Sequence, residues 1–162
     1  MKYWLYTMTA MMTFFLLIGC NAQSAVPEGY YAYEKDKVEQ AVQSLNFNPE
    51  LPSFVPIVAD ILVTDSFYLK ELDNQAFDIT IFTNANDIFT IQLINGELEE
   101  AEDEFESVAL DDSLEGYYQD HSYSKTLKWE KDDITYQIIY RPSESDISKE
   151  QLVKVAQSFD AL

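Results

Sequence analysis

The sequence predicts an α+β fold in which an antiparallel β-sheet of about six or seven strands packs against two amphipathic helices. Apolar residues recur with helical spacing at 34–45 and again after Ser148, whereas the sequence between them largely alternates with a period of two. Of the 162 residues, 47% are apolar and 14% aromatic, which is sufficient for one sizeable core. The composition therefore favours a single folded domain over a disordered chain.

The first helix is expected over 34–45. Four apolar residues fall there at i, i+3, i+4 and i+7, namely Val38, Ala41, Val42 and Leu45. Charged and amide side chains occupy the positions between them, as in a helix with one buried face.

The segment after this helix contains three prolines. Pro49, Pro52 and Pro56 each fix φ and remove a backbone donor within 47–56. This segment is predicted to be a stiff, extended connector and not a helix or a central strand.

Strands are expected where apolar and polar residues alternate or where β-branched residues dominate. The segments are 57–63, 66–72, 77–83, 88–94, 107–110, 116–123, 126–130 and 134–140. Asn84-Ala85-Asn86-Asp87 supplies the turn of one predicted hairpin, and Lys131-Asp132-Asp133 the turn of another.

Two further segments complete the predicted elements. Residues 97–106 form an acidic block, which we interpret as a helix with a thin apolar edge or as an irregular charged loop. Near the C-terminus, Ser148 stands three residues before Gln151, the pattern of a capping box. The helical apolar positions Leu152, Val155, Ala156 and Phe159 follow it, so this helix is expected to pack back onto the sheet.

The first twenty residues have the pattern of a secretory signal peptide. Lys2 precedes an apolar run that ends at Leu17-Ile18-Gly19-Cys20. This ending resembles a bacterial lipobox, in which the cysteine is lipidated and becomes the new N-terminus. An uncleaved membrane helix is the alternative, although a spanning helix needs about 20 apolar residues and polar residues follow Cys20 at once. We therefore predict a signal peptide at 1–19, a lipidated Cys20 with a flexible tether over 20–29, and one domain over 30–162.

The net charge limits the classes of partner, and the cysteine count limits disulfide formation. The formal net charge is −19, which argues against nucleic acid and against a domain lying flat on anionic lipid. Cys20 is the only cysteine, so no disulfide can form within a monomer. We expect a monomer that contacts a membrane through the lipid on Cys20, and whose partner, if it has one, is an envelope protein or a basic ligand.

No catalytic or metal-binding set stands out, and no cofactor is predicted. His121 is the sole histidine and is interpreted as a surface residue at a strand end. Asp111, Ser113, Glu115 and Gly116 imitate the start of an EF-hand loop, but Ser122 stands where the bidentate glutamate is required. Carboxylate pairs for glycoside hydrolysis could be chosen almost anywhere among 29 acidic residues, so their presence is uninformative.

Two groups of aromatic residues suggest either packing or binding. Trp129, Tyr136 and Tyr140 lie on predicted strands, where a place in the core is favoured over a ligand groove. Tyr30, Tyr31 and Tyr33 follow the tether directly. They form either a partner-docking surface or a cover for one end of the sheet.

Three segments of the C-terminal third form a recognisable pattern: Leu127-Lys128-Trp129, Tyr136-Gln137-Ile138 and the segment from Ile147 to Ser158 with its serine-initiated helix. This pattern resembles a bacterial extracytoplasmic family, domain of unknown function 4367. The turn carries Asp132-Asp133 where the family tends to have glycine. The resemblance implies a lipoprotein or an outer segment of a membrane-bound regulator, with no established activity.

These observations together predict a membrane-anchored, extracytoplasmic bacterial lipoprotein that is not an enzyme. Its expected role is a binding or interaction module of the cell envelope. The alternative is a hydrolase of envelope polymers that uses a carboxylate pair.

Overall fold

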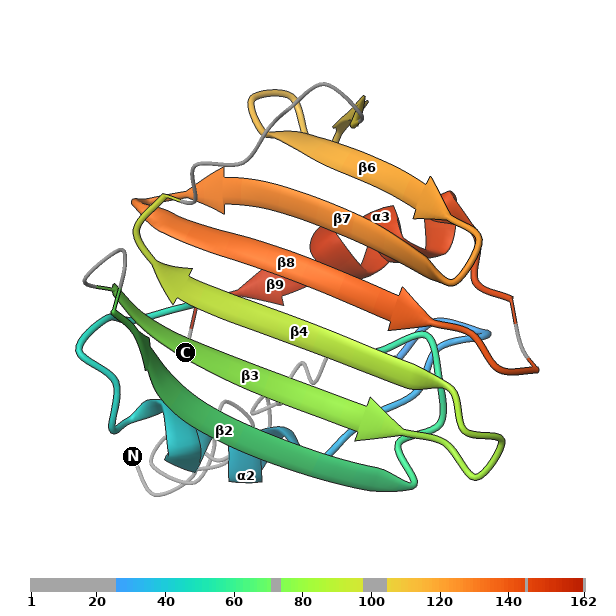
Figure 1. Cartoon of the computed structure of the whole chain (residues 1–162), viewed down its shortest axis with the longest axis horizontal. Helices are drawn as coiled ribbons and strands as arrows, with labels where there is room; N and C mark the ends of the chain where they lie inside the picture. The colour runs from blue at the N-terminus through green and yellow to red at the C-terminus, as the bar shows by residue number, and fades with distance from the viewer. Residues whose placement is uncertain (1–25, 71–73, 98–104, 145, 162) are drawn as a thin grey trace, which may run out of the picture.

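The computed structural model describes residues 26–70, 74–97, 105–144 and 146–161. A seven-stranded sheet dominates the fold, with strand order β2-β3-β4-β8-β7-β6-β5 and antiparallel pairing throughout (Figure 1). Its strands are β2 (Ile61–Leu69), β3 (Asn74–Phe82), β4 (Ile88–Asn95), β5 (Glu106–Ala109), β6 (Glu115–His121), β7 (Ser124–Lys131) and β8 (Ile134–Arg141). The predicted α+β class with a dominant antiparallel sheet is confirmed.

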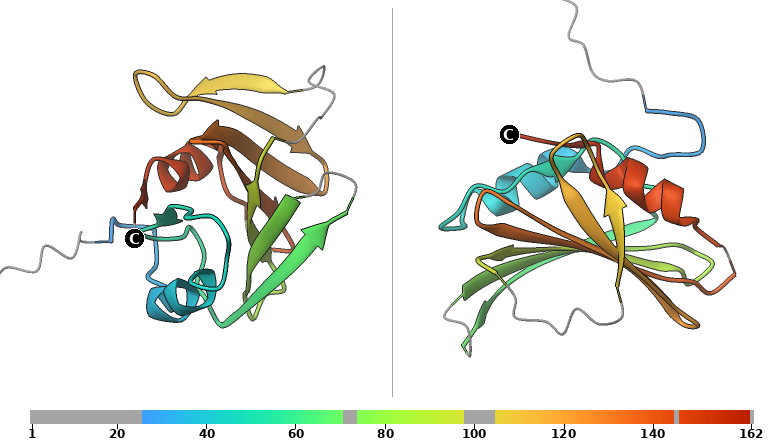
Figure 2. Two further views of the ribbon diagram at one scale, coloured as in Figure 1. Left: turned by 90° about the vertical axis from the view of Figure 1, so that its left-hand side faces the viewer. Right: turned by 90° about the horizontal axis from the view of Figure 1, so that it is seen from above.

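The two helices in the described part of the chain lie on the same face of this sheet (Figure 2). They are α2 (Lys35–Val42) and α3 (Lys149–Ala156). A second, two-stranded sheet pairs β1 (Leu51–Pro52) with β9 (Phe159–Asp160) on that side of the molecule. The helices and the small sheet thus form a layer that covers one face of the large sheet.

The core lies between the large sheet and this layer. One cross-strand row consists of Ile79, Ile91, Ile138 and Leu127, which are paired from β3 through β4 and β8 to β7. All four side chains are fully buried. Burying an aliphatic side chain of this size contributes about 1.5–3 kcal/mol, so this row is a major source of stability.

Three aromatic rings connect the sheet to the small sheet. Trp129 stacks on Tyr136 with ring centroids 5.3 Å apart, and Phe159 of β9 meets both rings edge-on at 4.9 and 5.6 Å. The Tyr136 hydroxyl also accepts a hydrogen bond from the backbone N–H of Glu50, just before β1. Together with the complete burial of Tyr140, this confirms the prediction that Trp129, Tyr136 and Tyr140 belong to the core.

The opposite face of the large sheet carries a polar row. Asp65, Asp78, Gln92 and Gln137 are cross-strand neighbours on β2, β3, β4 and β8. The Gln92 amide donates a 2.9 Å hydrogen bond to Asp78. Burial raises the pKa of the half-buried Asp78 carboxyl; the Gln92 hydrogen bond opposes this, and the Asp65 charge adds to it.

One prediction about the first half of the large sheet was wrong, and one strand pair was not predicted. Segments 57–63 and 66–72 were expected as separate strands, but the continuous register from Ile61 to Leu69 makes them one strand, β2. The residues 57–60 ahead of it are irregular, because they follow Pro56 and turn toward the β3–β4 loop. The β1–β9 pair was not expected, since Pro52 cannot donate a ladder hydrogen bond. Its carbonyl instead accepts one from the Tyr33 hydroxyl at 2.7 Å.

The capping box of α3 is confirmed. The Ser148 hydroxyl accepts from the Gln151 N–H at 3.3 Å, and the Gln151 side chain accepts from the Ser148 N–H at 3.0 Å. Of the acidic block, residues 98–104 lie outside the described residues, and Glu106 begins β5. The predicted signal peptide and Cys20 also lie outside them. No helix among the described residues is long and apolar enough to cross a bilayer.

Candidate functional site

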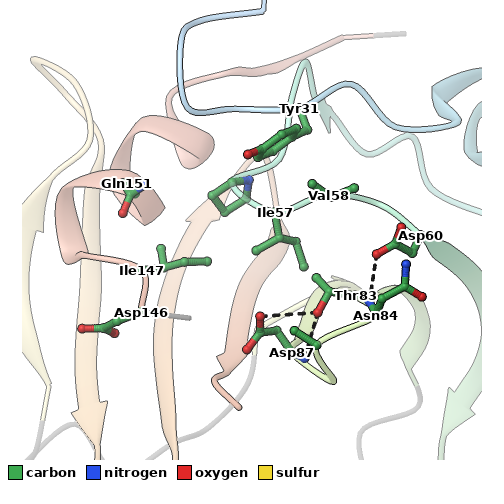
Figure 3. A pocket seen from close by; sticks show the side chains of 12 residues that line it. Tyr31, Ile57, Val58, Asp60, Thr83, Asn84, Asp87, Asp146, Ile147 and Gln151 are labelled. Carbon is green, nitrogen blue, oxygen red and sulfur yellow. Dashed lines mark hydrogen bonds between the residues drawn. The ribbon is translucent and has the colours of Figure 1, made fainter. Parts of the chain in front are cut away.

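A pocket of about 370 Å³ opens where four separate parts of the chain meet. Its lining comes from Tyr31 and from the segments 56–60, 83–87 and 146–151 (Figure 3). These are an isolated β-bridge between Tyr31 and Val55, the approach to β2, the β3–β4 turn and the residues that lead into α3. The volume is near the lower end of the range for small-molecule sites, about 300–1,000 Å³.

The β3–β4 turn forms one wall of this pocket. Asn86 adopts a positive φ of 65°, a conformation that asparagine tolerates better than most residues. The Asn86 N–H donates to the Thr83 carbonyl at 3.0 Å, and the Asp87 N–H donates to the Thr83 hydroxyl at 3.0 Å. The predicted turn sequence thus places Thr83, Asn84 and Asp87 around the same cavity.

Asp87 is the most buried acidic group of the pocket, with 1% of its surface exposed. One carboxylate oxygen accepts hydrogen bonds from the backbone N–H groups of Ser143 and Glu144, at 2.7 and 3.3 Å. The other accepts from the Thr83 hydroxyl at 3.4 Å. Burial raises the pKa of the neighbouring Tyr140 hydroxyl to about 12, with a further contribution from the Asp87 charge. Asp87 therefore fixes the pocket floor by joining the β3–β4 turn to the chain after β8.

Two further acidic residues, Asp60 and Asp146, are exposed and line the pocket at opposite edges (Figure 3). Asp60 accepts a hydrogen bond from the Asn84 backbone N–H at 2.8 Å. Asp146 forms an ion pair with Lys125, whose ammonium group also donates to the Ile147 carbonyl at 2.8 Å. Both acidic side chains are thereby oriented while remaining accessible to solvent.

Apolar side chains supply the rest of the lining. Ile57 and Ile147 are 5% and 2% exposed and supply buried apolar surface to the lining. Tyr31 and Val58, at 43% and 47% exposure, stand at the mouth. The arrangement combines an apolar surface with acidic groups at its edge, which suits a ligand that is both apolar and cationic.

Tyr30, Tyr31 and Tyr33, predicted to form either a partner-docking surface or a cover for one end of the sheet, lie in different environments. Tyr31 is exposed at the pocket and exchanges two backbone hydrogen bonds with Val55. Tyr30 packs edge-on against Phe54 at 4.9 Å, beneath the Lys154 ammonium group. Tyr33 is turned toward the core, where burial, with smaller contributions from nearby acidic groups, raises its pKa. Only Tyr31 of the three contributes to this pocket.

A second, more polar pocket of about 330 Å³ lies against β6. It is lined by Glu106, Tyr118, Gln119, Asp120 and His121. Lys149 pairs with Glu106 at 2.8 Å and lies 5.7 Å from the Tyr118 ring centroid. Burial, together with nearby acidic charges, raises the pKa of Tyr118 to about 12. Its lining comes only from Glu106 and β6 and offers less apolar surface than the first pocket, so this pocket is the weaker candidate.

His121 is exposed at the end of β6, where its ring stacks on Tyr123 with centroids 5.8 Å apart. The Asp111 carboxylate accepts hydrogen bonds from the N–H groups of Ser113 and Leu114, at 2.6 and 2.7 Å. These bonds lower the pKa of Asp111 and close a turn. Within the described ranges, no three His, Cys, Asp or Glu side chains are grouped so that they could hold a metal ion.

Sequence reasoning did not single out Asp60, Asp87 or Asp146. Asp87 was interpreted only as a turn residue, and Asp60 and Asp146 were not distinguished from the many other acidic residues. The one hint in the sequence was the turn Asn84-Ala85-Asn86-Asp87, because an aspartate in a turn often accepts hydrogen bonds from backbone N–H groups. Its partners at 143–144 are distant in sequence, so the pairing could not be anticipated.

Residues 61–159 match the family described as Domain of unknown function (DUF4367). The match extends from the first residue of β2 to Phe159 and covers more than half of the chain. It includes the pocket residues at 83–87 and 146–151 and leaves out Tyr31 and 56–60. No curated protein and no solved structure matches the chain. The chain belongs to the DUF4367 family.

Proposed function

We propose that this protein is a non-catalytic binding module of the bacterial cell envelope, anchored to the membrane through lipid on Cys20. The observation that carries the binding role is the pocket formed by Tyr31 and the segments 56–60, 83–87 and 146–151. Four distant parts of the chain build it, and hydrogen bonds hold its polar side chains in place. Such a preformed, partly apolar cavity with a few oriented polar groups is the usual form of a ligand site.

The position of the domain relative to the tether supports this role. The Tyr30 N–H donates to the Pro27 carbonyl at 3.1 Å, and Gly29 adopts a φ of 81°, so a tight turn precedes Tyr31. A fully extended segment 21–29 would span at most about 30 Å. The pocket would therefore remain near the bilayer, where it could meet other envelope components.

The chemistry of the lining favours recognition over catalysis. Its carboxylates are those of Asp60, Asp87 and Asp146, each of which already serves as an acceptor for a group of the protein. The Thr83 hydroxyl lies 3.4 Å from the Asp87 carboxylate, but that carboxylate also accepts from the backbone N–H groups of Ser143 and Glu144, which favours a structural role for Asp87 over that of a base activating a nucleophile.

The anchor is tested by intact-mass analysis of the protein isolated from its native membranes. A product beginning at Cys20 and carrying acyl chains is expected, and Cys20→Ser should leave an unprocessed precursor. Recovery of wild-type protein with residues 1–19 still attached, or without acyl groups at Cys20, would overturn the anchor proposal.

A hydrolase acting on envelope polymers is the second candidate, because three carboxylates share one concave site. Two-carboxylate glycoside hydrolysis requires one acid that gives up a proton and one carboxylate that attacks or activates water. Incubation with purified cell-wall glycan strands tests this role. Release of reducing ends that is lost in both Asp60→Asn and Asp146→Asn would support it, and no release by the wild-type protein would exclude this activity.

A further inference from the structure

One edge of the large sheet is a long strand that pairs on one side only. β2 (Ile61–Leu69) has nine residues and follows β3 in a continuous one-to-one register, whereas β5 at the other edge has four residues (Figure 1). Natural edge strands are usually shortened, bulged, or blocked by proline or lysine. β2 has no bulge, proline, lysine or arginine, and Asp65 is its one charged residue. The strand therefore lacks the usual features that prevent further pairing.

Alternate residues of β2 direct their backbone groups away from β3. Just beyond β3, the Thr83 N–H donates to the Asp87 carbonyl, so odd-numbered residues of β3 bond to β4 and even-numbered ones to β2. The register pairs even-numbered residues of β3 with odd-numbered residues of β2. The N–H and C=O groups of Thr64 and Ser66 consequently point outward. Within the described ranges, no hydrogen bond reaches these outward groups.

Lys37 of α2 covers the beginning of this edge. Its ammonium group donates to the outward carbonyl of Leu62 at 3.4 Å and pairs with Glu34 at 3.5 Å. The Lys37 side chain is 56% exposed, so this is a surface contact. The residues 64–69 follow it, and none of them lines the pocket described above. The open part of the edge is therefore separate from that pocket.

The side chains beside these backbone groups specify which strand would fit. Val63, Asp65 and Phe67 lie on the face of the sheet opposite the helices, with Val63 49% exposed, Asp65 exposed and Phe67 half-buried. Asp65 stands directly beside Asp78 of β3. In the described part of the chain, neither carboxylate forms an ion pair with a lysine or arginine. A cationic residue next to Asp65, with apolar residues beside Val63 and Phe67, would complement this row.

From these observations we propose that β2 binds an extended segment of a partner protein, which joins the sheet as a further strand antiparallel to β2. The segment exchanges backbone hydrogen bonds with Thr64 and Ser66. It carries lysine or arginine opposite Asp65 and apolar residues two positions to either side. These three residues occupy non-hydrogen-bonded positions, where facing side chains are closest. Strand addition of this kind is a known mode of peptide recognition.

A second copy of this chain suits the edge less well. Each copy carries a net charge of −19, which opposes self-association. If two β2 strands overlapped along their full length in antiparallel orientation, Asp65 of one copy would face Asp65 of the other. Like charges directly opposite one another destabilise a strand pair, whereas a facing lysine stabilises it. Charge complementarity therefore favours a partner strand with a cation at its centre.

The test uses the full chain in phosphatidylcholine vesicles, with protein-free vesicles as the blank. The probe is a fluorescent peptide with the central sequence Val-Thr-Lys-Thr-Val, and its binding is followed by anisotropy. Replacing the lysine with glutamate should weaken binding about fivefold, because repulsion replaces attraction. N-methylation of the two threonines, whose N–H groups face β2, should weaken binding at least about fivefold. N-methylation of the lysine and the second valine, whose N–H groups face solvent, should change it less than about twofold.

Matched variants locate the binding site. Asp65→Asn should weaken binding of the lysine peptide about 2- to 5-fold, whereas Asp112→Asn, at an exposed position elsewhere, should change it less than about twofold. Thr64→Pro removes an outward N–H that is not part of the β2–β3 ladder, so the fold should be retained. Binding to this variant should fall at least about threefold. Thr64→Val keeps the N–H and should bind normally. Thermal unfolding of each variant shows whether it is folded.

Several results would overturn the inference. They are no binding of the parent peptide, equal binding of the two N-methylated peptides, and undiminished binding to folded Thr64→Pro. A concentration-dependent dimer in sedimentation equilibrium that Thr64→Pro abolishes would assign the edge to a second copy instead. None of these measurements involves a pocket residue. Failure here therefore leaves the proposed role of the pocket unaffected, and failure of the pocket to bind a ligand leaves this inference unaffected.

Discussion

The Asp87 carboxylate accepts a 2.7 Å hydrogen bond from the backbone N–H of Ser143, which is 56 residues further along the chain. This bond joins the β3–β4 turn to the segment between β8 and α3. Both segments contribute walls or supports to the same pocket. The most buried acid of the pocket is therefore a structural residue that preserves the shape of the site.

Replacing Asp87 with alanine should destabilise the protein by about 2–4 kcal/mol. The change removes the acceptor of two backbone N–H groups, and an unsatisfied buried donor costs about 1–3 kcal/mol. Urea unfolding followed by far-UV circular dichroism measures the loss. Asp87→Asn retains a carbonyl oxygen and should be less damaging. An alanine variant as stable as the wild type would show that these bonds contribute nothing.

Trp129→Ala should cost about 3–5 kcal/mol, because Trp129 is 2% exposed and packs between Tyr136 and Phe159. Trp129→Phe should cost less, since it retains an aromatic ring. Chemical unfolding measures both changes. Tyr123→Ala, at a side chain that is 70% exposed, serves as the control and should lie within about 0.5 kcal/mol of wild type. A similar small effect at Trp129 would contradict its assigned place in the core.

Asp78→Asn should stabilise the protein at neutral pH. Burial raises the pKa of Asp78, so its contribution to stability is present below the unfolded-state pKa and is lost as pH rises through the folded-state pKa. Asparagine cannot ionise, so the variant avoids the fall in stability that accompanies ionisation of Asp78. It also removes the repulsion from Asp65, which lies directly opposite on β2. Like charges at such positions cost about 0.2–1 kcal/mol.

Melting temperatures recorded from pH 3 to pH 7 test this prediction. The Asp78→Asn variant should gain on the wild type as pH rises above the ordinary range of an aspartate. Asp65→Asn should reproduce only the part due to repulsion. A variant that loses stability at pH 7 would show that the ionised carboxylate of Asp78 is required.

Ser148→Ala should destabilise α3 and the domain by about 0.5–2 kcal/mol, because it removes the acceptor for the Gln151 N–H. Ser148→Asp restores a capping oxygen and should recover most of the loss. Equilibrium unfolding compares the three proteins. If the alanine and aspartate variants are equally impaired, the cap is not the source of the effect.

Local patterns in the sequence predicted much of the fold. The 77–83 and 88–94 alternation identified the β3–β4 hairpin, and Ser148 with Gln151 identified the start of α3. Both features depend on residues close in sequence, so a period or a spacing is enough to reveal them. Trp129 was likewise placed in the core by its position on an apolar strand.

Features that depend on distant partners were not predictable. Leu51 and Pro52 became a strand because Phe159 and Asp160 lie beside them, not because of their own propensity. The break expected between 63 and 66 is absent, since continuous pairing with β3 overrides a locally polar stretch. The pocket was missed for the same reason: Tyr31, Asp60, Asp87 and Asp146 come together only in the folded protein.

The β1–β9 pair has a consequence for how the chain acquires its structure. Leu51 and Pro52 find their partners more than a hundred residues later, and Phe159 closes over Trp129 only at that point. Such long-range closure slows folding. A nascent chain that has not yet produced residues 159–160 would therefore leave an aromatic surface exposed, and a variant lacking these residues should aggregate more readily than the chain that contains them.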